Sequence, residues 1–97
     1  MTRHLDTSAI KSRVNTARFY SRHTGKEIPD REGWHSTHCP FHEDSTPSLR
    51  VRIPGGGFFC HGCGAKGGDV IAFFMKLTGL PFRKAALAID QQEELAQ

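Results

Sequence analysis

The chain contains 97 residues, which is enough for one small domain with a limited core. Its 37% hydrophobic and 24% charged residues are ordinary globular values, and no apolar run approaches the roughly 20 residues that cross a membrane. We therefore expect a cytoplasmic protein without membrane association, since no signal peptide is recognised either.

The net charge of +3 is unevenly distributed along the chain. Residues 1–52 contain nine Lys or Arg against six Asp or Glu, whereas residues 53–97 contain four of each kind. The basic excess suits a polyanionic partner, although a solvated surface more often explains an imbalance of this size.

A helix is expected near the N-terminus. Residues 6–8 are all good N-caps, and Ile10 and Val14 follow at helical spacing. This pattern predicts a helix from about Ser8 to Tyr20. Residues 21–33 are polar and rich in turn formers, so they are expected to form an irregular connection.

Residues 34–60 predict a small antiparallel sheet. We expect a first strand from Trp34 to His38, then a loop over residues 43–48. A hairpin over residues 49–60 follows, with a glycine-rich turn before its second strand begins at Phe58.

The first strand of this hairpin alternates strictly between apolar and basic side chains. Leu49, Val51 and Ile53 share one face, which should pack inward. Arg50 and Arg52 share the other face and are expected to meet water or a ligand.

Two short motifs, Cys39-Pro-Phe-His42 and Cys60-His-Gly-Cys63, are typical of the two halves of a four-ligand zinc site. Structural zinc is bound tetrahedrally by sulfur and nitrogen, usually with two ligands from each of two tight turns. Gly62 and Gly64 allow the second turn to bend sharply and to point backbone N–H groups at the sulfurs. We therefore expect one structural zinc ion, with the ligands Cys39, His42, Cys60 and Cys63.

Other assignments of these residues stay open. Three cysteines are an odd number for a disulfide framework, and a reducing compartment favours metal binding, but buried thiols or one disulfide are alternatives. His42 is favoured as the fourth ligand because it completes a C-x2-H turn. His35, His38 and His61 lie close to the cysteines in sequence and are its rivals.

Two helices are expected in the C-terminal part. Asp69 is an N-cap candidate, residues 70–77 are largely apolar, and Gly79 is a natural terminator. A second helix begins at Leu80-Pro81, and residues 91–97 should fray. The inner stripe of this second helix comprises Phe82, Ala85 or Ala86, and Ile89.

These elements predict a small α+β fold. It is a zinc ribbon, a short antiparallel sheet clamped by metal, flanked by an N-terminal helix and C-terminal helices. We expect residues 1–97 to form a single zinc-binding domain, with a ribbon core over about 34–64 and a helical part over about 69–95.

Two apparent nucleotide-binding motifs are rejected. Gly62-x-Gly64-x-x-Gly67 matches a dinucleotide fingerprint, but it overlaps the metal turn and no second parallel strand follows. Ala65-Lys66-Gly67 lacks the Ser or Thr that completes a Walker loop. Four protein ligands close the coordination sphere of zinc, so we expect that the chain is not catalytic on its own.

A further set of motifs occurs in a specific order over at least residues 34–89: Cys39-Pro-Phe-His42, Thr46-Pro-Ser48, Cys60-x-Gly-Cys-Gly64, Gly67-Gly-Asp-Val-Ile71, Phe73, Leu80-x-Phe82 and Ala85. In order and spacing they resemble the zinc-binding domain at the N-terminus of bacterial DnaG-type DNA primases. The resemblance implies a zinc ribbon that helps a primase to engage its single-stranded DNA template and to choose where RNA primers begin. It also implies that catalysis belongs to a separate TOPRIM-type polymerase domain.

The chain departs from this family pattern at four places. Ser45 and Leu49 replace a Lys and a Phe beside Thr-Pro-Ser, and His61 replaces an aromatic residue after the third ligand. The hairpin tip carries only glycines at residues 55–57, where the family commonly has Lys and aromatic residues. Two arginines of the same hairpin, at positions 50 and 52, are able to compensate.

Three hypotheses for function follow. The first is a zinc-dependent module of DNA primase type that binds single-stranded DNA in the initiation of replication, together with a separate polymerase domain or protein. Its candidate nucleic-acid contacts are Arg50, Arg52, Trp34, Phe58 and Lys66. For Trp34 and Phe58, burial in the core is the alternative. The second is a protein-interaction module that docks on a replicative helicase or polymerase, and the third is a regulator that mimics the primase domain.

Overall fold

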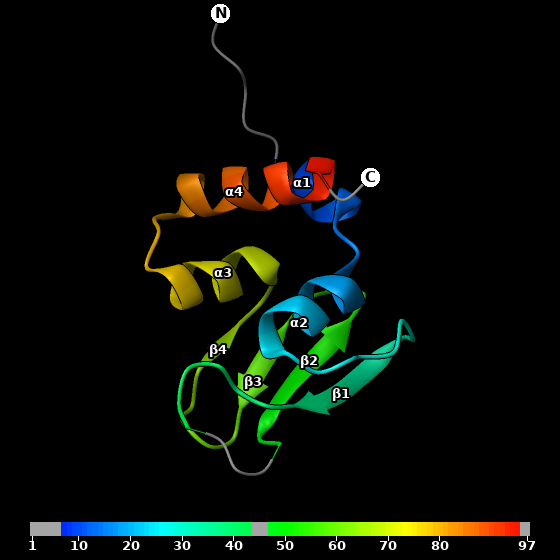
Figure 1. Ribbon diagram of the computed structural model, residues 1–97, viewed down its shortest axis with the longest axis vertical. Helices are drawn as coiled ribbons and strands as arrows, with labels where there is room; N and C mark the ends of the chain where they lie inside the picture. Colours follow the sequence, from blue (N-terminus) through cyan, green and yellow to red (C-terminus); the bar gives the residue numbers. More distant parts are fainter. Residues whose placement is uncertain (1–6, 44–46, 96–97) are drawn as a thin grey trace, which may run out of the picture.

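The computed structural model describes residues 7–43 and 47–95. The described residues form four helices and one four-stranded sheet (Figure 1). In chain order the elements are α1 (Thr7–Arg13), α2 (Thr16–Thr24), β1 (Gly33–Thr37), β2 (Leu49–Ile53), β3 (Phe58–Cys60), β4 (Lys66–Gly67), α3 (Val70–Thr78) and α4 (Phe82–Leu95). The predicted small α+β fold, an antiparallel sheet flanked by helices, is confirmed.

The sheet has the order β1-β2-β3-β4, and every neighbouring pair is antiparallel. Its register sets Trp34 opposite Arg52, and Arg50 opposite Phe59. Phe59 in turn lies opposite Lys66 of β4. The strand β4 was not predicted, because two residues are too short for any alternation to be visible in the sequence.

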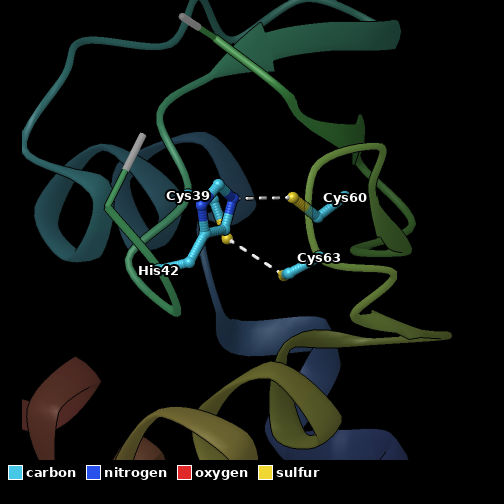
Figure 2. Close-up of side chains that lie close together, drawn as sticks. All are labelled: Cys39, His42, Cys60 and Cys63. Atoms are coloured by element: carbon cyan, nitrogen blue, oxygen red, sulfur yellow. Dashed lines mark hydrogen bonds between the residues drawn. The ribbon is translucent and has the colours of Figure 1, made fainter. Parts of the chain in front are cut away.

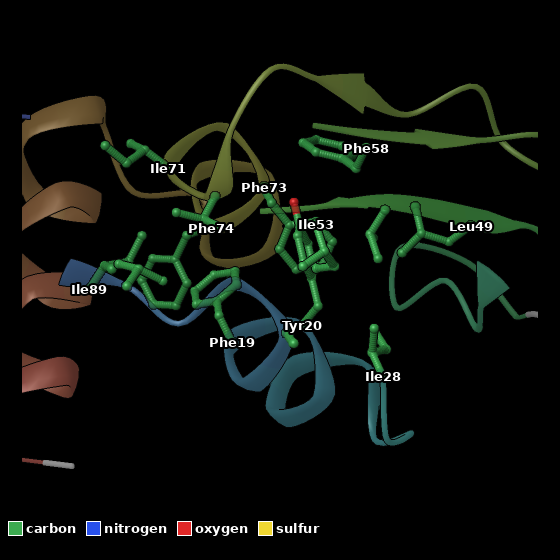
Figure 3. Packing of buried hydrophobic residues seen from close by; sticks show 14 of the residues in the cluster. Phe19, Tyr20, Ile28, Leu49, Ile53, Phe58, Ile71, Phe73, Phe74 and Ile89 are labelled. Atoms are coloured by element: carbon green, nitrogen blue, oxygen red, sulfur yellow. The ribbon is translucent and has the colours of Figure 1, made fainter. Parts of the chain in front are cut away.

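The hydrophobic core lies between one face of the sheet and the helices (Figure 3). Tyr20 of α2 and Phe73 of α3 meet edge to face with ring centroids 4.9 Å apart, and Phe58 of β3 packs on Phe73 in the same way at 5.2 Å. The Tyr20 hydroxyl donates a hydrogen bond to the carbonyl of Gly56 at the hairpin tip. The buried aromatic side chains therefore join both helices to the hairpin.

The α3 helix begins and ends as predicted. The Asp69 side chain accepts a hydrogen bond from the Ala72 N–H at 2.8 Å, which caps the first turn. Gly79 takes a left-handed conformation with φ of 77°, which ends the helix. The α3 and α4 helices, which are joined by a short connection, pack together, and Phe74 and Ile89 both belong to the buried core (Figure 3).

The predicted helix from Ser8 to Tyr20 is wrong in its continuity. Asn15 has an extended backbone, and its side chain accepts from the Arg18 N–H at 3.0 Å, so a new helix begins there. The break lets α1 pack against α4 while α2 packs on the sheet (Figure 1). The expectation of irregular structure from residue 21 is also wrong, since α2 continues to Thr24 and Gly25 ends it with φ of 74°.

Two expectations for α4 need correction. Ala85, Ala86 and Ile89 are buried as expected, but Phe82, the first residue of the helix, is 46% exposed. The fraying expected from residue 91 is not observed up to Leu95. Some predicted features lie outside the described residues. They are the N-cap candidate Asp6, the loop residues 44–46, which include Ser45 and Thr46, and the end of the chain at residues 96–97.

The cap at Asn15 gives a test of the break between α1 and α2. We expect Asn15→Ala to lower the free energy of unfolding by about 1 kcal/mol, because one N–H of the first turn of α2 loses its acceptor. Asn15→Asp keeps an acceptor and is the matched control, with stability close to that of the native chain. Urea unfolding of the metal-loaded protein measures both; equal stability of the two variants would contradict the assigned cap.

Candidate metal centre and open face of the sheet

The predicted metal ligands come from two turns at one end of the sheet. Cys39 and His42 follow β1, whereas Cys60 ends β3 and Cys63 lies in the turn before β4. Their ligand atoms all lie within 4.8 Å of one another. Figure 2 shows the four side chains pointing toward a common centre. The structure thus brings together the four residues that the two motifs indicated.

The separations of these atoms fit a zinc tetrahedron. Zn–S bonds of about 2.3 Å and Zn–N bonds of about 2.0–2.1 Å give tetrahedral edges of about 3.8 Å between sulfurs and about 3.6 Å between sulfur and nitrogen. The Sγ atoms of Cys39 and Cys63 are 3.8 Å apart, and Cys60 Sγ lies 3.4 Å from His42 Nε2. These are the two contacts drawn as dashed lines in Figure 2.

The tautomer of His42 supports the same assignment. Its Nδ1 lies 2.8 Å from the Glu43 carbonyl oxygen, so Nδ1 carries the proton and donates it. The lone pair of Nε2 is then directed at the sulfurs, as a metal ligand requires. Of the rival histidines, none belongs to the cluster among the described residues: His35 Nε2 contacts the Arg31 carbonyl at 2.7 Å, and the His61 ring packs on Phe59.

The face of the sheet opposite the helices is exposed and carries basic and aromatic side chains. Its members are Trp34 of β1, Arg50 and Arg52 of β2, Phe59 of β3 and Lys66 of β4, which are all exposed. We call this set the open face. It includes four of the five nucleic-acid contacts that the sequence suggested, each on the solvent side.

The expectation for Phe58 is corrected by its burial. This side chain is 3% exposed and packs on Phe73, so the core alternative holds and its ring offers no free face to a base. Phe59, which is 39% exposed, takes its place on the open face and was missed. Alternation could have found it, because Phe58 shares the inward face of β3 with the ligand Cys60, which leaves Phe59 on the outward face.

A shallow hollow of about 270 Å³ lies in the open face, lined by Trp34, Arg50, Phe59 and His61. Beside it, the Arg52 guanidinium lies over the Trp34 ring, 6.0 Å from the ring centroid. Trp34 is 45% exposed, so its ring stays accessible at the edge of this hollow.

Comparison with known proteins agrees with this geometry. A family model described as CHC2 zinc finger, of the DnaG zinc-ribbon type, matches residues 8–96. The chain belongs to this family. The predicted relation to the zinc-binding domain of DnaG-type primases is thereby confirmed.

Several relatives of this zinc finger are DNA primases. A DNA primase of Treponema pallidum is 35% identical over 84 residues, which cover 87% of the chain and 13% of that protein. A DNA primase of Mycolicibacterium smegmatis is 51% identical over 47 residues, which cover 48% of the chain and 7% of that protein. The chain therefore spans only a small part of the length of these relatives.

A solved structure is similar over nearly the whole chain. The crystal structure of the Aquifex aeolicus primase, with its zinc-binding and RNA polymerase domains, matches with a TM-score of 0.73 and 26% identity. The match covers 95% of the zinc finger described here and 22% of the Aquifex chain.

No described helix of the zinc finger has both the length and the apolar character of a membrane span.

The environment of the zinc-finger thiols differs between the two motifs. Burial raises the pKa of the Cys60 thiol, but hydrogen bonds from the Ser48 hydroxyl and from backbone N–H groups, together with the contact to His42, outweigh it and lower the pKa to about 6. Burial raises the pKa of the Cys39 thiol to about 12, and the neighbouring cysteines add to this effect. Cys60 is therefore more readily ionised than Cys39, and a bound cation would take the place of the proton on Cys39.

Ser48 is a supporting residue that the sequence reading missed. Its hydroxyl lies 3.4 Å from both His42 Nε2 and Cys60 Sγ, so it touches one ligand of each motif. The backbone reinforces this link, because the His61 N–H donates to the Ser48 carbonyl at 2.9 Å. In the sequence, the Thr-Pro-Ser motif indicates only a family resemblance, since the contact of Ser48 with the candidate ligands arises in the tertiary structure.

Gly62 is required by the close approach of these groups. A Cβ atom at this position would lie 2.8 Å from His42 Nε2 and 2.9 Å from Ser48 Oγ. Both distances are shorter than real Cβ contacts, and the first is to a candidate ligand atom. A side chain here would therefore displace the imidazole from the centre.

We expect Gly62→Ala to weaken zinc binding about tenfold or more, since ligand orientation controls metal affinity. Gly68→Ala is the matched control, because a Cβ at Gly68 meets nothing within 4 Å and its backbone is not left-handed. Competition with a chromophoric zinc chelator measures both affinities. Equal zinc affinity of the two variants would contradict the role given to Gly62.

Proposed function

We propose that this zinc finger is a zinc-dependent module that binds single-stranded template DNA during the initiation of DNA replication and primer synthesis. The polymerase activity would belong to a further domain or to a separate protein, and a replicative helicase is a possible partner. The observation that carries the proposal is the open face, where basic and aromatic side chains from all four strands share one solvent-exposed surface.

The chemistry of the open face suits unpaired nucleic acid. Every base has a π face that stacks on aromatic rings such as Trp34 and Phe59, and each such stack contributes about 1–3 kcal/mol. Arginine and lysine neutralise phosphates and release counterions. The register supports this use, because Arg52 lies beside Trp34 on the neighbouring strand, while Arg50 and Lys66 lie on the two strands that flank Phe59.

Zinc has a structural part in this proposal. One pair of candidate ligands follows the edge strand β1 and the other pair surrounds the turn from β3 to β4, so a bound ion would hold the sheet that carries the open face. Four protein ligands leave no open coordination position, which is the arrangement of structural rather than catalytic zinc. The ion would supply folding energy.

A second candidate function is docking on a replication protein. It is favoured by a hollow of about 410 Å³ beside the metal centre, lined by Pro40, Phe41, Cys63, Lys76 and Leu77. The Lys76 ammonium lies over the Phe41 ring at 5.6 Å, so the hollow combines an apolar wall with one cation. A module that only docks through this hollow would ignore oligonucleotides at moderate salt.

Fluorescence anisotropy of labelled oligonucleotides, over a salt series and with a duplex control, tests the proposal. We expect salt-sensitive binding that favours single strands. The double variant Arg50→Ala/Arg52→Ala should bind more weakly and flatten the slope of log K against log salt by about 1.4, because two positive charges that offset the phosphate backbone are lost. Arg83→Ala/Lys84→Ala removes two exposed cations of α4 and is the matched control with an unchanged slope. Absence of binding at low salt would transfer the assignment to the docking function.

Removal of zinc gives a separate prediction. Chelation, or the change Cys60→Ser, should unfold residues 34–64, because the binding energy of such a site is largely folding energy. Circular dichroism would record the loss of structure, and anisotropy would record the loss of DNA binding. A chelated protein with an unchanged spectrum would refute the structural role of the ion.

A further inference from the structure

We propose that the hollow in the open face holds one unpaired base of the bound strand and that Arg50 selects guanine there. The inference rests on the proposed function and adds a base preference to it. The hollow is lined by Trp34, Arg50, Phe59 and His61 and measures about 270 Å³. It is the part of the open face where aromatic rings and an arginine surround the same space.

The strand order places the arginine between two aromatic walls. Arg50 lies on β2, with Trp34 on β1 to one side and Phe59 on β3 to the other. Arg50 and Phe59 are direct register partners, whereas Trp34 is the partner of Arg52, two residues further along β2. The two rings therefore lie on opposite sides of the strand that carries Arg50, two residues apart along it. A base that stacks on either ring can still reach the guanidinium.

The two arginines of β2 differ in their surroundings. The Arg52 guanidinium lies over the Trp34 ring, and its side chain also borders the hairpin tip at Gly55. Within the described residues, the Arg50 side chain makes no hydrogen bond, ion pair or cation–π contact. Its guanidinium therefore keeps all its donors for a ligand, while Arg52 is suited to support the tryptophan and contact phosphate.

Arginine in such a place has a preferred base. The planar guanidinium donates two parallel hydrogen bonds, which match the adjacent O6 and N7 acceptors of guanine. Adenine presents a donor, its N6 amino group, where guanine has O6, so the same fork cannot form. Among the described residues, no Asp or Glu lines the hollow, so none of their carboxylates competes for Arg50. Cytosine also has two adjacent acceptors, O2 and N3, but its single ring covers less of the aromatic walls.

The test uses anisotropy with the zinc-loaded chain and short oligothymidylates that contain one dG, one dA, one dC or no other base. We expect the dG strand to bind about tenfold more tightly than the dA strand, a ratio within the range of one bidentate contact. Replacement of guanine by 7-deazaguanine removes N7 and should abolish the preference. Replacement by hypoxanthine keeps O6 and N7 and should preserve it.

The variants separate base selection from charge. Arg50→Lys keeps the positive charge but not the fork, so it should retain affinity for oligothymidylate and its salt slope while losing the dG preference. Arg52→Lys is the matched control and should keep the preference. Retained oligothymidylate affinity also demonstrates that the Arg50→Lys chain is folded.

Each other outcome has a definite meaning. Equal binding of all four strands, tighter binding of the dC strand, or a preference that survives 7-deazaguanine or Arg50→Lys would overturn the guanine assignment and leave the proposed function intact. Failure of every single strand to bind at low salt would overturn the proposed function, and the base preference with it.

Discussion

The convergence of four ligand side chains at one end of the sheet is the constraint on which this structure depends. Cys39 and His42 come from the loop after β1, and Cys60 and Cys63 from the β3–β4 turn. These strands do not pair directly, because β2 lies between them. A metal bound there would therefore fix the edge strand relative to the far half of the sheet and would add to the limited core of a small domain.

The same register that buries the core also creates the open face. Leu49, Val51 and Ile53 face the helices, so the arginines between them must face solvent. The ligand Cys60 has the same effect on β3, where it holds Phe58 inward and Phe59 outward. A slip of one residue would exchange the two faces. Metal binding, core packing and the chemistry of the open face are therefore satisfied by one register.

The structure gives physical reasons for the departures from the family pattern at Leu49, at the hairpin tip and at His61. Leu49 is fully buried and serves the core rather than a ligand. At the hairpin tip, Gly56 has a φ of 88°, and its carbonyl oxygen accepts a hydrogen bond from the Tyr20 hydroxyl. A Cβ atom at this position would lie close against Val70. The tip is thus held by packing, and the exposed arginines and aromatic rings lie in the middle of the sheet instead. His61 lines the hollow next to Phe59.

The chain matches the primase zinc-binding region and spans only 13% of the Treponema relative. Most of the length of that relative therefore has no counterpart in the zinc finger described here.

The sequence by itself determined the features whose causes are local. The spacing of the two metal motifs, the alternation of residues 49–53, and the caps at Asp69 and Gly79 each depend on a few neighbouring residues, and the structure agrees with all of them. The break at Asn15 was also encoded locally by an N-cap residue, but helical periodicity on both sides of it concealed the signal.

Only the tertiary structure decided the features that depend on distant partners. The burial of Phe58 requires Phe73 of α3, the strand β4 exists through its pairing with β3, and the different surroundings of Arg50 and Arg52 depend on where Trp34 of β1 lies. The alternation of residues in a sequence predicts on which face of a strand a side chain lies, but not which residues of other elements pack against it. For that reason the cluster of four candidate metal ligands was predictable, whereas the composition of the open face was predictable only in part.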